Sequence, residues 1–288
     1  MLSVTNLSSY IFCARKLFLE KVLGFEEIPK EAMVKGTVRH NFYELLNGKE
    51  EEIVSSIEEK MGIEDIESLY VNSCRLLLQK SLGNNKEKLE KANLKANELF
   101  RQIWPLVMKE AKSRAQNIHS FSQMHLVFGM DLWEKLTPKI TSEFHIVSEK
   151  LQLKGIIDQI EDYGNGVVPI ELKTGSCPRE GVWPGHRIQA GAYAIMLEEH
   201  YNQPVKEAFV TYVDFQERRH IPINPFLHDE IREILQKTRG LLQSRELPDY
   251  CGNKNKCASC SLKETCYNPE KVNKRMEELF NVEFPHQS

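Results

Sequence analysis

The sequence predicts a mixed α/β fold in which one mixed β-sheet is flanked by helices. Apolar and polar residues alternate within 125–173, as they do in half-buried strands. Apolar residues at helical spacing dominate the chain before this region, and a helix at 187–201 followed by a strand at 205–215 comes after it. The 288 residues, with 41% hydrophobic and 27% charged, suit one soluble globular domain over 1–288.

Helical patterns fill most of the first 125 residues. Helices are expected over 10–19, 32–46, 50–82 and 84–118. Ser8 is placed to cap the first of them, and Pro105 should kink or break the last. We therefore expect a helical insertion at about 50–125, ahead of the sheet.

Strands dominate the middle of the chain. They are expected over 140–147, 151–161, 166–173, 205–215 and 218–223, with helices over 187–201 and 229–243. The turn Gly164-Asn165-Gly166 joins the second and third strands into a hairpin. No internal repeat interrupts this order.

Composition excludes several classes of protein. The net charge of −3 argues against coating nucleic acid by bulk charge, although an enzyme with a local basic groove remains compatible with it. No run approaches the ~18 apolar residues of a membrane span. The first residues lack a basic region followed by an apolar stretch, so no secretory signal is expected. We expect a cytoplasmic protein without membrane contact.

Two acids and a lysine end the predicted hairpin strands. Asp158 follows Gly155-Ile156-Ile157, and Glu171 and Lys173 follow a second apolar run. Residues two apart on a strand point to one face, so Glu171 and Lys173 project together and Asp158 can join them across the hairpin. Carboxylates at the ends of buried strands are costly unless they are paired or bind a cation. This grouping predicts a divalent metal site that activates water for phosphodiester cleavage; charges alternating on a surface strand are the plainer alternative.

Two weaker signals accompany it. Gln189 and Tyr193 share one face of the predicted helix at 187–201, and a half-buried helix face would explain them equally well. His40 lies four residues after Gly36 on an early helix, where an ordinary core or surface histidine is the plain alternative. Glu143, on the strand before Asp158, is a further acid that we leave outside the predicted site.

Taken in order, these residues resemble the PD-(D/E)xK nuclease superfamily and its RecB-like branch. That branch has a helical G-x-x-x-H, then G-x-I/V-D, E-x-K and Q-x-x-x-Y, which the chain matches at Gly36–His40, Gly155–Asp158, Glu171–Lys173 and Gln189–Tyr193. The resemblance implies a restriction-endonuclease-like sheet. It also implies metal ligation by His40, Asp158, Glu171 and the Leu172 carbonyl, water positioning by Lys173, and support of the lysine and of DNA by Gln189 and Tyr193. Oxygen-rich ligands with one imidazole suit Mg²⁺ or Mn²⁺.

The cysteines suggest a second metal centre. Seven cysteines in a chain without a secretory signal disfavour a disulfide framework. Cys257, Cys260 and Cys266 are closely spaced, and a fourth ligand could be Cys13, Cys251 or a histidine. Spacing alone allows either zinc or an iron–sulfur cluster.

The motifs also resemble those of the CRISPR-associated RecB-like exonucleases, and this resemblance implies an iron–sulfur cluster and not zinc. In that family, one early cysteine and three late ones hold a [4Fe–4S] cluster. This implies Cys13, Cys257, Cys260 and Cys266 as ligands, with the segment at about 250–270 closing onto the N-terminal helix. Cys251 lies close enough in sequence to compete.

The same family implies a function: metal-dependent cleavage of single-stranded DNA, often 5′ to 3′, that trims spacer precursors before a CRISPR integrase inserts them. Single-stranded DNA or DNA with single-stranded overhangs is the expected substrate, and the helical insertion is a candidate contact for a homo-oligomer. Alternatives are a RecB-like repair or viral exonuclease, a non-cleaving iron–sulfur DNA-binding protein, and a structural zinc protein in which the acidic motif is accidental.

Overall fold

The computed structural model of the protein describes residues 1–26 and 31–280. The strands in this part of the chain are β1 (Leu2–Ser3), β2 (Lys139–Ser148), β3 (Leu153–Asp162), β4 (Val167–Lys173), β5 (Glu207–Tyr212) and β6 (Glu217–Pro222). The helices are α1 (Val4–Phe12), α2 (Ala14–Lys21), α3 (Glu31–Asn47), α4 (Glu50–Ser55), α5 (Ile63–Asn84), α6 (Lys86–Lys91), α7 (Ala96–His125), α8 (Gly129–Lys135), α9 (Pro184–Tyr201), α10 (Pro225–Gln243), α11 (Lys254–Ser259), α12 (Lys263–Cys266) and α13 (Pro269–Phe280).

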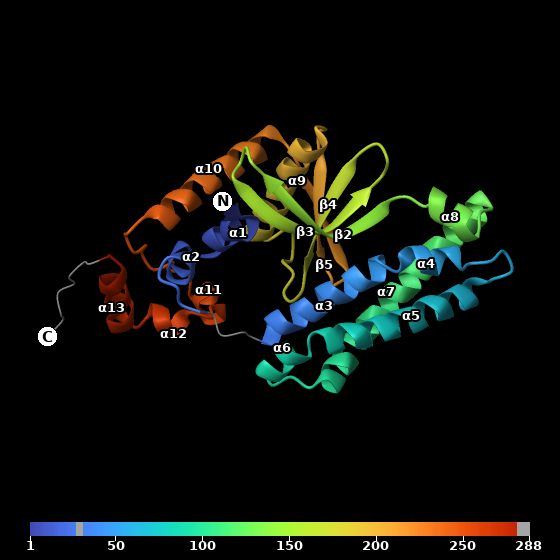
Figure 1. The fold of residues 1–288 in the computed structure, drawn as a ribbon, viewed down its shortest axis with the longest axis horizontal. Helices are drawn as coiled ribbons and strands as arrows, with labels where there is room; N and C mark the ends of the chain where they lie inside the picture. The colour runs from blue at the N-terminus through green and yellow to red at the C-terminus, as the bar shows by residue number, and fades with distance from the viewer. Residues whose placement is uncertain (27–30, 281–288) are drawn as a thin grey trace.

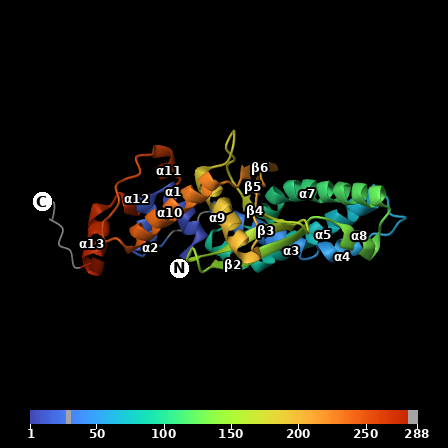
Figure 2. The same cartoon turned by 90° about the horizontal axis from the view of Figure 1, so that it is seen from above.

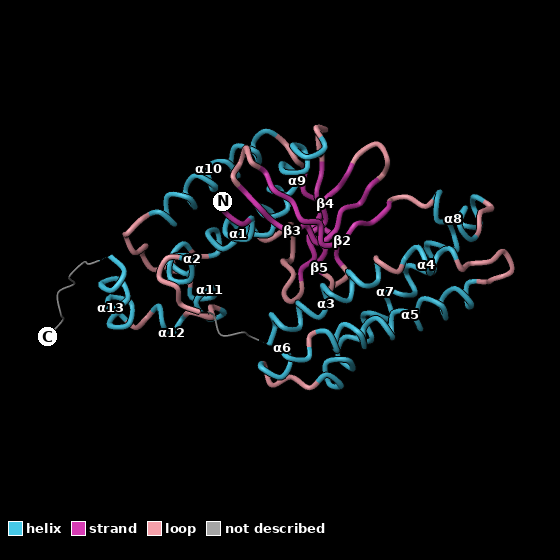
Figure 3. The backbone as a smooth tube through the Cα atoms, viewed as in Figure 1, coloured by secondary structure: helices cyan, strands magenta, loops and turns pink. Residues whose placement is uncertain are grey.

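The strands form one mixed sheet in the order β1-β3-β4-β5-β6, and β2 pairs with β3 as well. The β2–β3, β3–β4 and β5–β6 pairs are antiparallel, whereas β1–β3 and β4–β5 are parallel. Figure 3 shows this sheet between helices on both sides. The predicted mixed sheet flanked by helices is confirmed.

One face of the sheet is covered by α9, with α1 and α10 beside it (Figures 1 and 2). The α9 segment from Ile188 to Leu197 is buried along its whole length, so none of its sides faces solvent. The main core therefore lies between α9 and the sheet, with Ile157, Ile160 and Val210 on the sheet side.

Helices α3 to α8 form a second body, here called the helical module, with its own core (Figure 1). In α7, buried residues recur at steps of three and four from Leu99 to Ser122, so one stripe faces the interior of this body, where α7 packs against α5. Pro105 lies inside α7, and the helix continues through it. Of the predicted kink or break at Pro105, the break does not occur; the helical pattern at 84–118 is instead divided between α6 and α7.

The first helix also differs from the prediction. Ser3, not Ser8, begins α1, and its backbone N–H donates to Asn6 Oδ1 at 3.0 Å. Ser8 lies inside α1, and the helix ends at Cys13, whose extended backbone (φ −168°) separates α1 from α2. The predicted single helix is therefore two helices with a cysteine at the junction.

The two ends of the described chain meet. Phe18, Leu19 and Leu23 pack against Leu262, Val272 and Met276 to form a third core. In Figure 1 this group, with α2 and α11 to α13, lies on the opposite side of the sheet from the far end of the helical module.

Alternate residues of β2 point to different sides of the sheet in its first and second halves. Ile140 and Ser142 face the helical module, where Ser142 bonds to Asn47 at 2.7 Å, yet Phe144 lies in the core under α9. In a regular strand these alternate residues would share one face. The change occurs at Glu143, whose backbone is left-handed (φ +52°) and which has no partner in the β2–β3 register.

Candidate active site

Three carboxylates lie side by side on adjacent strands. Glu143 and Asp158 are not themselves paired, but the neighbouring β2–β3 pairs on both sides of them bring the two residues opposite each other. If the β3–β4 register is extended by one residue, Asp158 lies opposite Glu171. On its other edge β3 pairs with β1 at 153–154 and with β4 at 159–162, so Asp158 lies in the interval between these partners. The Leu172 backbone N–H donates to Asp158 Oδ2 at 2.7 Å and fixes that carboxylate.

Helix α3 brings a histidine to these acids. A Cβ on Gly36 would lie 3.1 Å from Thr174 Oγ1, so glycine lets α3 pass close to the end of β4. One turn later, His40 Nδ1 lies 3.2 Å from Asp158 Oδ1. Burial alone would lower the pKa of His40, but the hydrogen bond to Asp158 and the nearby carboxylate charges raise it overall.

Within the described residues, His40, Glu143 and Asp158 form a group that could hold a metal ion. One ligand atom from each lies within 4.8 Å of the others. Burial first, and then the charge of Asp158, raise the pKa of Glu143, as expected for acids that lack a cation between them. An imidazole and two carboxylates suit a divalent ion such as Mg²⁺ or Mn²⁺.

Glu171 lies beside this group and is 2% exposed. Its Oε1 accepts from Lys173 Nζ at 2.6 Å and from Gln189 Nε2 at 2.7 Å, and Lys173 Nζ also donates to Gln189 Oε1 at 3.0 Å. Its Oε2 is buried and has no hydrogen-bond partner among the described residues. Burial, followed by the charge of Asp158, raises the pKa of Glu171 to about 7. A buried carboxylate oxygen without a donor fits a divalent cation at this position.

Tyr193 lies beneath the site and is 2% exposed. Its ring packs against Gly155, where a Cβ would come within 2.6 Å of Tyr193 Cε1. Burial raises the pKa of Tyr193, whose hydroxyl lies close enough to the Gln189 side chain and the Ile156 backbone to interact with both. Glycine at position 155 is thus explained by packing, because a larger residue there would collide with the tyrosine ring that lies beside Gln189.

The structure brings His40, Asp158, Glu171, Lys173, Gln189 and Tyr193 around one cleft of about 600 Å³. The acid that sequence reasoning left out is Glu143, which belongs to the metal-sized group with His40 and Asp158. Its place depends on a left-handed residue within β2. The alternating pattern of β2 carries no signal of that conformation.

The cysteines gather between α1, α2 and the C-terminal segment. Cys13, Cys251, Cys257, Cys260 and Cys266 all line one small cavity with Phe12 and Leu262. The Sγ atoms of Cys251 and Cys257 are 3.4 Å apart, and Cys251 also lies near Cys13. The four predicted ligands are therefore together, and Cys251 is among them as a fifth thiol. Cysteine thiolates brought together in this way suit an iron–sulfur cluster or zinc.

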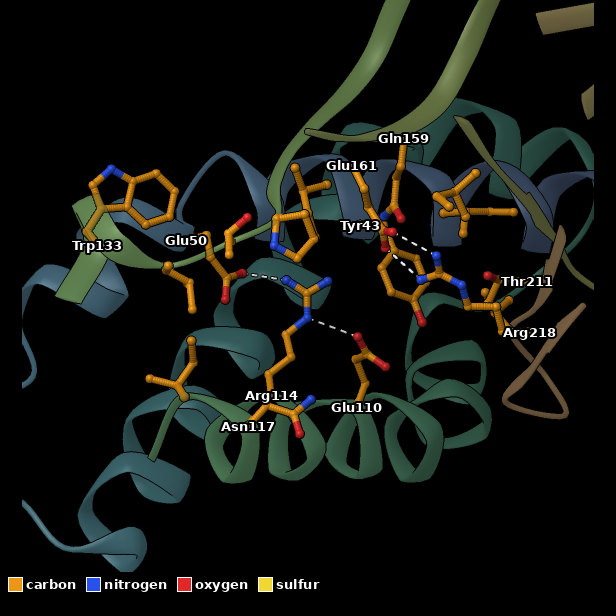
Figure 4. A pocket seen from close by; sticks show the side chains of 18 residues that line it. Tyr43, Glu50, Glu110, Arg114, Asn117, Trp133, Gln159, Glu161, Thr211 and Arg218 are labelled. Carbon is orange, nitrogen blue, oxygen red and sulfur yellow. Dashed lines mark hydrogen bonds and ion pairs between the residues drawn. The ribbon is translucent and has the colours of Figure 1, made fainter. Parts of the chain in front are cut away.

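A second large cavity, of about 400 Å³, lies between the sheet and the helical module (Figure 4). Arg114 pairs there with Glu50 and Glu110, and Arg218 forms two bonds to Glu161 at 2.6 and 2.7 Å. Each cation in Figure 4 is thus matched by a carboxylate. Leu172 separates this cavity from the carboxylate cleft, because it lines the former while its neighbours Glu171 and Lys173 line the latter.

Comparison with known proteins agrees with this arrangement. Residues 1–267 match the family described as the PD-(D/E)XK nuclease superfamily. The chain belongs to this superfamily. The predicted superfamily is confirmed.

Several curated relatives are similar to parts of the chain. A CRISPR-associated exonuclease Cas4/endonuclease Cas1 fusion of Leptospira interrogans is 30% identical over 148 residues, which is 48% of this chain and 27% of that protein. CRISPR-associated exonuclease Cas4 of Francisella tularensis subsp. novicida is 27% identical over 42% of this chain and 59% of its own length. The DNA replication ATP-dependent helicase/nuclease dna2 of Schizosaccharomyces pombe is 22% identical over 92% of this chain and 18% of its own length.

The match thus spans about a quarter of the fusion protein and less than two thirds of the stand-alone exonuclease. These relatives support a Cas4-like member of the superfamily. In the part of the chain that the structure describes, no helix is long and apolar enough to cross a membrane.

Proposed function

We propose that the protein is a metal-dependent exonuclease that hydrolyses phosphodiester bonds of single-stranded DNA, from 5′ to 3′, in CRISPR adaptation. One observation carries the proposal: Lys173 shares a cleft with Asp158 and Glu171 and bonds to Glu171, while one buried oxygen of Glu171 has no hydrogen-bond partner among the described residues. A structural ion pair on a strand would not require a second, unpartnered carboxylate oxygen beside a histidine and two further acids.

Four side chains are proposed to hold the divalent ion, Mg²⁺ or Mn²⁺. They are His40, Glu143 and Asp158, together with the free oxygen of Glu171. The ion would lower the pKa of a bound water and neutralise charge on the phosphate. We assign Glu143 to this set in addition to the residues expected from the motif.

Three further side chains are proposed to position the water and to stabilise charge on the phosphate. Lys173 has its ammonium held between Glu171 and Gln189, so it is fixed to orient a water and to stabilise negative charge on the scissile phosphate. Gln189 bonds to both partners of that ion pair and keeps Lys173 from turning away. Tyr193 acts through Gln189 and not on the phosphate, because it is buried under Gly155.

For the cysteine cavity we propose a [4Fe–4S] cluster held by Cys13, Cys257, Cys260 and Cys266. The cavity joins α1 and α2 to the C-terminal segment, so the group has a structural role. Two features support it: the thiols converge from distant parts of the sequence, and Phe12, Leu19 and Leu262 line the cavity beside them.

The relatives support a proposal for the biological setting. Because one relative is a fusion of Cas4 with endonuclease Cas1, we propose that the chain trims spacer precursors for a Cas1-type integrase in the cytoplasm. A second candidate is an exonuclease of DNA replication or repair. The alignment with the helicase/nuclease dna2, over 92% of this chain, supports that alternative.

The test is cleavage of end-labelled single-stranded DNA with Mn²⁺ or Mg²⁺, by the wild type and by Lys173→Ala. Lys237→Ala, which removes an exposed lysine on α10, is the matched control. We expect metal-dependent products from the wild type and the control, none from Lys173→Ala, and a ladder that gives the polarity. Absence of cleavage by metal-loaded wild type would contradict the proposal and favour a DNA-binding role.

A further inference from the structure

The carboxylate cleft continues away from the proposed metal site along the β2–β3 ribbon. The lining of the cleft includes His145 and Val147 of β2 and Lys154 and Ile156 of β3, in addition to the acids. The register pairs His145 with Ile156 and Val147 with Lys154. On β3, Lys154, Ile156 and Asp158 are spaced two residues apart and all three line the cleft, with Val147 and His145 opposite the first two.

This row has a regular spacing. A strand rises about 3.4 Å per residue, so successive pairs on one face lie roughly 7 Å apart. The His145–Ile156 pair is thus roughly 7 Å from the acids, and Lys154 roughly 14 Å from Asp158. A few nucleotides of an extended strand would cover this distance.

The chemistry of the row differs from that of an ordinary sheet surface. Ile156 is 41% exposed and Val147 is 55% exposed, although both lie inside a cleft. Lys154 forms no ion pair with any residue that the structure describes, and the side chain of His145 has no hydrogen bond within that same part of the chain. Apolar side chains with an unpaired cation suit sugars and bases followed by a phosphate.

We infer that this row is the floor on which the substrate strand lies next to the scissile phosphate. The inference rests on the proposed nuclease function. A strand whose phosphate reaches the acids must continue out of the cleft, and the cleft continues along these pairs. Ile156 and His145 contact the adjoining nucleotide, and Lys154 neutralises a phosphate further along. The occupant is a single-stranded polynucleotide.

The experiment compares charge at two lysines of one hairpin. Lys154→Ala removes the cation of the row, and Lys150→Ala removes an exposed lysine from the β2–β3 turn outside the cleft lining. Steady-state cleavage of a 5′-labelled single-stranded 20-mer is measured from low to moderate salt. For Lys154→Ala we expect KM to rise about fivefold with kcat within about twofold, and the slope of log KM against log salt to fall by ~0.7. Lys154→Arg should restore the wild-type KM and salt slope, and Lys150→Ala should change neither KM nor the salt slope.

A second pair of variants tests the apolar part of the row. Ile156→Asp places a negative charge beside the strand and should weaken binding of the labelled 20-mer about tenfold or more, measured by fluorescence anisotropy in Ca²⁺. Leu76→Asp, at a 66%-exposed position in the helical module, is the control and should leave binding unchanged. Urea unfolding of both variants is measured as well, to check that each of them is folded.

The outcomes separate the two proposals. If the wild type cleaves but Lys154→Ala and Ile156→Asp behave like their controls, the inference is wrong and the nuclease proposal stands. If the wild type does not cleave, the nuclease proposal is wrong, and a binding loss confined to Lys154→Ala and Ile156→Asp would still support the row as a strand-binding surface. Equal binding of a blunt duplex and a single strand would overturn the single-stranded occupant.

Discussion

Replacing Gly155 with alanine should damage both stability and catalysis through Tyr193. The added Cβ would lie 2.6 Å from Tyr193 Cε1 and 3.2 Å from its hydroxyl. Carbon atoms normally approach to about 3.5 Å or more, so the ring or β3 must move by roughly 1 Å. Tyr193 is 2% exposed, and its surroundings leave little room for such a shift.

The size of the effect follows from two opposing contributions. Overpacking a well-filled core costs about 1–3 kcal/mol, while alanine in a strand gains about 0.5–1 kcal/mol over glycine. We therefore expect Gly155→Ala to lower the free energy of unfolding by up to about 2.5 kcal/mol, with a central value of about 1 kcal/mol. A shift of Tyr193 also displaces Gln189 and hence Lys173, so kcat should fall by up to about 100-fold.

Urea unfolding and single-stranded DNA cleavage measure the two effects. Gly83→Ala is the control, because a Cβ there meets nothing within 4 Å and α5 should gain up to about 1 kcal/mol. Tyr193→Ala removes the obstructing ring, so Gly155→Ala should cost nothing further in that background. The reasoning is refuted if Gly155→Ala is as harmless as Gly83→Ala, or if its penalty persists without the ring.

Three further predictions concern the two centres and the pH dependence. Lys173→Ala should abolish cleavage but keep DNA binding by anisotropy, since Lys173 acts on the transition state; unchanged turnover would remove it from the mechanism. Cys260→Ala should lose iron on elemental analysis whereas Cys251→Ala keeps it, and an equal loss in both would make Cys251 a ligand. Burial lowers the pKa of His186 to about 3, so the folded state disfavours its protonation. The stability that neutral His186 contributes is complete above about pH 6.5 and is lost as the pH falls toward 3. His186→Gln should therefore reduce the change in the free energy of unfolding with pH over that range, as measured by urea unfolding at several pH values. An unchanged pH dependence would contradict this.

The sheet and the central residues of the site could be predicted from the sequence, because they depend on local patterns. Alternation identifies β2, β3 and β4, and the tight turn between β3 and β4 fixes which residues face each other. Asp158 and Glu171 therefore meet as expected. His40 required the motif order, since nothing local distinguishes it from another helical histidine.

Other features depend on long-range packing and have no local pattern. Glu143 joins the acids only because β2 takes a left-handed residue there. The helix break at Cys13 has no glycine or proline to announce it, and α1 reads as continuous with α2. The row of His145, Val147, Lys154 and Ile156 looks like an ordinary exposed face until the cleft is seen.

The meeting of the two ends of the chain also sets the order of its synthesis and folding. The cysteine at 13 is made first, and its partners from 257 onward come 244 residues later. At about 5–20 residues per second, translation leaves the early helices without those partners for about 10–50 s. Phe18, Leu19 and Leu23, which are fully covered in the native protein, stay unmatched throughout this interval. A nascent chain of this protein therefore presents an apolar, thiol-bearing segment suited to chaperone binding until α11–α13 emerge.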